Sequence, residues 1–260
     1  MTQMDNTLGD LLGTDAHFVV LVGRTPQKFT LRCDSFIPRS EFFQREREKA
    51  RNKELRRYSD EPIIIANECP QAFADYTRFV YFGGVPDILG NAELPQQQSH
   101  FSRQISLYVL AERLGDFRTA NRMSDAIFTH SRDFDILPEK DAINLAYRST
   151  GPDSLLRALL RDIMVYERID PHTDEHWYNV RLNEFHSEFR DDVLVELMSL
   201  VIESPDSTVD EAVGQEVLYK RIMDCELHHH DDNSEWNPKC LRSGSTNILI
   251  VVAERMHTFR

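Results

Sequence analysis

The amino-acid sequence predicts an α+β fold in which a small sheet forms early in the chain and helices follow it. Three short segments between residues 17 and 66 carry the apolar runs or the alternation typical of strands. From residue 68 onward apolar residues recur at helical spacing, and the sequence shows no internal repeat of fixed period. Strands that cluster before a series of helices indicate an α+β fold. Apolar residues make up 41% of the 260 residues, so a packed core is expected.

The three predicted strands come first in the chain. His17–Val22 is largely an apolar run, and Gln27–Arg32 alternates between polar and apolar residues. Residues 23–26 form a turn sequence with Gly and Pro, so the two segments are expected to pair as a hairpin whose register stays open. Glu61–Ala66, which contains three consecutive isoleucines, is the third predicted strand.

The first helices are expected to alternate with these strands. Ser35–Phe43 opens a helical stretch, because Pro38 suits a helix start. Residues 45–57 hold seven basic and three acidic residues, so they are interpreted as a solvated helix or loop. The next helix is predicted to begin near Pro70 and to stop at Gly83.

Six later helices and a set of core positions complete the prediction. The expected helices are Arg103–Leu114, Phe117–Thr129, Pro138–Tyr147, Ser154–Tyr166, Pro171–Glu188 and Asp191–Glu203. The positions expected in the core are Phe18, Val20, Leu31, Phe36, Phe42, Ile64, Phe73, Phe79, Leu110 and Leu114, together with the segments around Cys33 and Cys69. Each large apolar side chain that is buried contributes about 1.5–3 kcal/mol.

Charge is distributed unevenly along the chain. The formal net charge is −13, and residues 160–235 hold 6 basic against 20 acidic residues. Residues 236–260 reverse the sign, with 4 basic residues against 1 acidic residue. The acidic region argues against nucleic acid as the main partner, because neutralising phosphates needs a basic face.

Membrane contact and secretion are not expected. No segment approaches the roughly 20 consecutive apolar residues that a membrane helix needs. Met1–Asp10 has no basic n-region of a secretory signal. We therefore expect an intracellular protein of the nucleus, the cytoplasm or both.

Four segments in the first half of the chain resemble the BTB/POZ domain family in its fungal form. In chain order they are Thr14-Asp15, Arg39-Ser40-Glu41-Phe42-Phe43, Cys69–Gly83 and Leu107–Ala120. They are similar to the family's Ser-Asp opening, its Arg-Ser-x-Phe-Phe run, its Asp-Pro-x-Ala-Phe segment and its penultimate helix pair. The resemblance implies a BTB/POZ-like domain at residues 10–132, a small three-stranded sheet packed with helices. A mainly helical acidic region would follow at residues 133–260.

The resemblance also implies a function. It is that of a non-enzymatic adaptor or scaffold, a module that binds other proteins and can form a homodimer. The interaction residues that it implies are Leu8, Leu11, Leu12, Asp15, Phe42 and Phe43. The alternative is a substrate adaptor that binds the cullin scaffold of a ubiquitin ligase.

Some residues depart from the family's pattern where the pattern bears on function. Arg32 stands where the family has a histidine, and Cys33 stands where a basic residue often follows, so recruitment of corepressors is not expected. Gln44–Glu54 lacks the large apolar anchor that cullin-binding members carry, and buried anchors supply most of the binding energy in protein interfaces.

One segment has the ligand set of a zinc site. Cys225, His228 and His230 are followed by Cys240, and two thiolates with two imidazoles suit tetrahedral zinc. A structural zinc site within residues 225–240 is therefore one expectation, and a polar loop is the alternative. A zinc-dependent enzyme is the least favoured function, because no convincing general base lies near these residues in the sequence.

Overall fold

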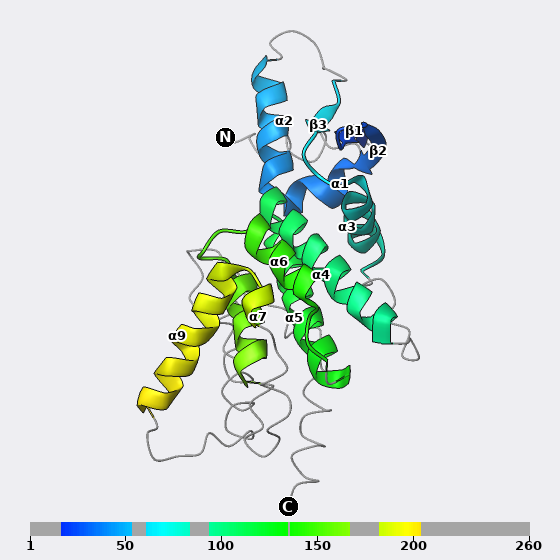
Figure 1. Cartoon of the computed structure of the whole chain (residues 1–260). Coiled ribbons are helices and arrows are strands. Elements are labelled where there is room, and N and C mark those ends of the chain that lie inside the picture. The colour runs from blue at the N-terminus through cyan, green and yellow to red at the C-terminus, as the bar shows by residue number, and fades with distance from the viewer. Residues whose placement is uncertain (1–16, 54–60, 84–93, 135, 167–181, 204–260) are drawn as a thin grey trace, which may run out of the picture.

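The computed structural model describes residues 17–53, 61–83, 94–134, 136–166 and 182–203. These residues form an α+β fold with a small mixed sheet and a larger set of helices, which confirms the predicted fold class. The sheet and the first helices lie at one end of the molecule, and the later helices extend away from them (Figure 1).

The sheet has three strands in the order β2-β1-β3. β1 (His17–Val22) pairs antiparallel with β2 (Gln27–Arg32), in a register that places Val22 opposite Gln27. β3 (Ile63–Ile65) lies parallel to β1 on its other side. A parallel pair needs a crossover connection, and the helices between β2 and β3 supply it. The predicted hairpin is confirmed, and the third strand is shorter than expected.

β3 turns its middle residue to solvent. Ile63 and Ile65 are partly buried against the core, whereas Ile64 is 67% exposed. Successive side chains of a strand point to opposite faces, so three consecutive isoleucines cannot all enter the same core. The prediction that Ile64 is a core residue is therefore wrong.

Four helical segments surround the sheet. The segments between β2 and β3 are α1 (Cys33–Phe36), the 3-10 turn η1 (Ile37–Arg39) and α2 (Glu41–Lys53), and α3 (Pro70–Phe82) follows β3. Pro70 occupies the first turn of α3, where its missing N–H is not needed. Gly83 ends this helix in the left-handed conformation and donates its N–H to the carbonyl of Phe79. Both predicted ends of α3 are confirmed.

The remaining helices form the larger end of the molecule. They are α4 (Leu94–Leu114), α5 (Phe117–Phe134), α6 (Lys140–Ser149), α7 (Leu155–Tyr166), the 3-10 turn η2 (Leu182–Glu184) and α9 (Ser187–Glu203). α4 begins at Leu94 and not at the predicted Arg103. Pro95 does not interrupt the helix, because a proline is tolerated in the first turn. The predicted break between Glu188 and Asp191 is wrong, since neither glycine nor proline stands there and α9 runs through it.

A single cluster of buried apolar side chains runs from the sheet into these helices. Seven of the residues predicted as core are buried, namely Val20, Leu31, Phe36, Phe73, Phe79, Leu110 and Leu114, and Phe18 and Phe42 are partly buried. Aromatic rings meet edge to face near the sheet, with centroids 5.9 Å apart between Phe36 and Tyr76. Such pairs add about 0.5–1.5 kcal/mol beyond the area they bury.

Position 132, where the resemblance ends, lies inside α5. The buried cluster includes residues on both sides of this position, such as Met123 in α5 and Ile163 in α7. The division into two domains therefore stays a prediction. Among the helices described here, none has both the length and the apolar composition required to span a membrane.

Gly115, in the turn between α4 and α5, lies directly against the start of α2. Its φ is 64°, a conformation that residues with a Cβ rarely adopt. A Cβ added there would lie 2.9 Å from the Cβ of Glu41, closer than real Cβ contacts allow. Gly83 has a similar φ of 69° but nothing within 4 Å of an added Cβ.

We therefore expect Gly115→Ala to destabilise the protein more than Gly83→Ala does. Both substitutions carry the left-handed cost of about 1–2 kcal/mol, and Gly115→Ala adds about 1–3 kcal/mol of steric strain against α2. Unfolding by urea, followed by circular dichroism, measures both variants against the parent chain. Equal losses of stability would contradict the close packing of α2 on this turn.

Candidate functional site

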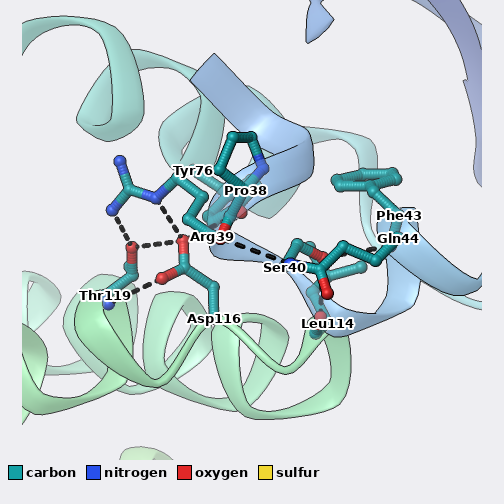
Figure 2. Close-up of polar contacts among 9 residues, drawn as sticks. All are labelled: Pro38, Arg39, Ser40, Phe43, Gln44, Tyr76, Leu114, Asp116 and Thr119. Atoms are coloured by element: carbon teal, nitrogen blue, oxygen red, sulfur yellow. Dashed lines mark hydrogen bonds and ion pairs between the residues drawn. The ribbon is translucent and has the colours of Figure 1, made fainter. Parts of the chain in front are cut away.

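A buried aspartate joins the sheet end of the molecule to the later helices. The side chain of Asp116, in the turn before α5, has no exposed surface. Arg39 of η1 donates from Nε to Asp116 Oδ2 over 2.8 Å, and the hydroxyl of Tyr76 in α3 donates to the same oxygen over 3.0 Å (Figure 2). Three segments that are distant in sequence therefore meet at one negative charge.

Thr119 completes the surroundings of this carboxylate. Its backbone N–H donates to Asp116 Oδ1 over 3.0 Å, so Asp116 caps the first turn of α5. Its hydroxyl donates to Asp116 Oδ2 over 2.8 Å and accepts from Arg39 Nη2 over 2.9 Å. We call Arg39, Tyr76, Asp116 and Thr119 the Asp116 cluster. The carboxylate accepts four hydrogen bonds from the chain itself, so the cluster connects η1, α3 and the first turn of α5.

Ser40 makes a second connection beside the Asp116 cluster. Its hydroxyl donates to the carbonyl of Leu114 over 2.7 Å and accepts from the backbone N–H of Phe43 over 3.3 Å (Figure 2). Ser40 therefore caps α2 and attaches it to the end of α4. Burial, and the nearby charge of Asp116, raise the pKa of Tyr76 well above its usual value, so its hydroxyl stays a donor.

A second polar centre holds α9 against α6 and α7. The guanidinium of Arg157 in α7 lies 4.6 Å from the ring centroid of Tyr147, and its Nη2 donates to the carbonyl of Tyr147 over 2.6 Å. The same guanidinium pairs with the carboxylate of Glu188 in α9. The hydrogen bond from Arg157 holds the pKa of Glu188 below its usual value.

Three carboxylates of α9 contact the body of the molecule. The pairs are Glu188 with Arg157, Asp192 with the hydroxyl of Tyr147, and Glu196 with Arg161. The three carboxylates are spaced by four residues, which places them along one side of a helix. Phe189 and Val193 are buried on the same side. α9 is therefore attached by charges as well as by apolar packing.

The opposite side of α9 is apolar and exposed. Leu194 is 49% exposed, Val195 64% and Met198 63%, and we call these three residues the α9 stripe. Asp191 is exposed one turn before them, whereas Arg190, the only basic residue of α9, is partly buried. Neighbouring apolar side chains of this size on a surface are typical of a contact with another molecule. α9 lies at the outer edge of the helical end, beside α7 (Figure 1).

The interface between α4 and α5 contains buried polar side chains. Gln104, Ser124 and His130 are almost wholly buried, and their polar side-chain atoms have no hydrogen-bond partner within the chain. The ring of His130 lies 4.5 Å from that of Phe101 and 5.7 Å from that of His100, measured between centroids. Burial, assisted by His100, lowers the pKa of His130 to about 4. The imidazole is therefore neutral at pH 7.

Two of the predicted interaction residues lie in the described part of the chain. Phe43 is completely buried and packs against Phe18 and Phe36, so it is a core residue and not a surface contact. Phe42 is partly buried against the same core. The reason is local: Ser40 caps α2, and the first turn of this helix then directs Phe43 inward.

The other predicted site residues lie outside the described part of the chain. They are Leu8, Leu11, Leu12 and Asp15 of the interaction set, and Cys225, His228, His230 and Cys240 of the zinc set. Within the described ranges, no group of three or more His, Cys, Asp or Glu side chains could hold a metal ion. Cys69, expected in the core, is exposed because it precedes the first turn of α3, and Cys33 is partly buried.

Sequence reasoning missed the α9 stripe. The signal was present, since Val193–Ile202 is apolar except at Glu196 and Ser199. A helix that is apolar on every side exceeds what one buried face can accommodate. Comparison of the chain with protein-family models, curated proteins and solved structures found no match.

We expect Asp116→Ala to destabilise the fold by about 3–5 kcal/mol. The substitution leaves the partly buried Arg39 and the buried Tyr76 without their shared hydrogen-bond acceptor. Urea unfolding measures this loss. The matched control is Asp153→Ala, which removes an exposed carboxylate and should change stability by less than about 0.5 kcal/mol. Similar effects of the two substitutions would contradict the structural role of the Asp116 cluster.

We also expect His130 to make stability depend on pH. Its folded-state pKa of about 4 lies below the ordinary 6.5, so its neutral form is favoured by folding. Stability is then fully present above pH 6.5 and falls as the pH drops toward 4, by about 3 kcal/mol in total. Urea unfolding of the parent chain and of His130→Phe at several pH values measures the difference. Parallel pH curves for the two proteins would contradict this assignment.

Proposed function

We propose that this protein is a non-enzymatic protein–protein interaction module, an adaptor or scaffold built on a BTB/POZ-like domain. The sequence segments that resemble this family support the proposal, as does the three-stranded sheet with helices packed around it. In particular, Arg39, Ser40 and Phe43 of the Arg-Ser-x-Phe-Phe run all have structural partners. Motif residues that build a core support a fold, and the function must be argued from the surface.

The observation that carries the proposal is the α9 stripe. Its three side chains are exposed next to one another on a helix that charges and buried residues hold in place. Exposed apolar side chains contribute binding energy when a partner removes them from water, whereas charged rims mainly set the rate of association. The stripe therefore has the character of an anchor for another protein.

The hydrogen bonds of two buried charged residues support a structural role for this part of the interior. Asp116 and Arg157 are buried charged residues with several partners, and their hydrogen bonds connect helices to one another. Charges that are saturated by the chain are typical of structural networks rather than of groups that take part in proton transfer.

Affinity purification with mass spectrometry tests the proposal. The full chain is compared with a double variant, Val195→Asp with Met198→Asp, and with the control Ser187→Asp, which adds a carboxylate to α9 without removing apolar surface. We expect specific partners to be lost at least about tenfold from the double variant and retained by the control. An identical set of partners on all three proteins would overturn the role of the α9 stripe.

A further inference from the structure

The chemistry of the α9 stripe and its surroundings defines the kind of partner that fits it. Leu194 and Met198 lie four positions apart in α9, so they form one ridge along the helix, with Val195 beside it. Ridges of this spacing pack into the grooves of another helix. An apolar ridge on an exposed helix therefore matches an amphipathic helix.

The charge of α9 selects among such helices. The helix contains five carboxylates and one guanidinium. Three of the carboxylates contact the body of the protein, and Asp191 remains exposed at the beginning of the stripe. The wider region is acidic too, with 6 basic against 20 acidic residues between positions 160 and 235. Complementary charge speeds association and suppresses wrong partners, so a basic helix is favoured.

We infer that the α9 stripe binds a basic amphipathic helix of a partner protein, with apolar residues on one face and lysine or arginine beside them. This inference rests on the proposed function, because it names the partner of the same surface. A second copy of this chain is the less favourable occupant, since it would bring two acidic helices together.

Fluorescence anisotropy with two designed peptides tests the inference on the full chain. Both peptides have about 20 residues, a length that allows a helix to form, and both carry leucine on one face. One has lysine on the opposite face and the other has glutamate. We expect the lysine peptide to bind at least about tenfold more tightly than the glutamate peptide. Equal affinities would overturn the inference.

The double variant Val195→Asp with Met198→Asp separates the stripe from general attraction to an acidic protein. It adds two carboxylates, so non-specific attraction would make the lysine peptide bind more tightly. Binding at the stripe predicts the opposite, a loss of at least about tenfold, because the apolar contact is removed. Unchanged or tighter binding overturns the inference.

Charge substitutions test whether the lysine peptide contacts α9. Asp191→Lys should weaken binding of the lysine peptide, while Asp153→Lys, at an exposed position in the turn before α7, should change it much less. Equal effects of the two would overturn the assignment to α9. Light scattering of the full chain provides a second check, since a dimer that the double variant dissociates would assign the stripe to a second copy instead.

The two proposals fail in different ways. If the lysine peptide does not distinguish the parent chain from the double variant, the basic helix is wrong as the occupant. The proposed function still stands in that case, provided that mass spectrometry finds partners that depend on Val195 and Met198. Loss of that dependence overturns the proposed function itself.

Discussion

The junction between the sheet end and the later helices depends on the buried carboxylate of Asp116. A charge removed from water is costly unless donors surround it, and here the donors come from η1, α3 and the first turn of α5. The sheet end and the helical end must therefore meet in one relative position for the charge to be satisfied. Ser40 fixes the same junction a few residues away, where its hydroxyl joins α2 to the carbonyl of Leu114. Apolar packing alone is less directional than these hydrogen bonds.

Polar contacts also attach α9, and their position on the helix leaves an apolar side exposed. The carboxylates of Glu188, Asp192 and Glu196 pair with Arg157, Tyr147 and Arg161 on the side of α9 that faces the molecule. Phe189 and Val193 pack inward on the same side, whereas Leu194, Val195 and Met198 face outward. The exposed stripe is thus a direct result of how the helix is anchored, because one side of a helix cannot present both sets of residues.

The sequence predicted the fold class because its signals were local. Strand alternation in Gln27–Arg32 and the glycine at position 83 each act within a few residues. Ile64 was misassigned because three identical residues carry no period, and the face that each one takes depends on where β1 pairs with β3. The Asp116 cluster could not be predicted, since Arg39 and Asp116 are separated by 77 positions and nothing near either residue indicates the other. The zinc set near Cys225 lies outside the described residues and stays a prediction.

Rigid attachment is what makes an exposed helix suitable as a binding surface. A partner that binds a mobile segment must also bear the entropy of ordering it, which reduces the net affinity. α9 is held by ionic and hydrogen-bonded contacts spaced along more than two turns and by Phe189 and Val193 in the core, so its outward side chains are already positioned. Met198 adds adaptability, because its flexible thioether can fit differently shaped partner surfaces. A fixed backbone with an adaptable apolar side chain favours recognition of a class of helices over that of one unique sequence.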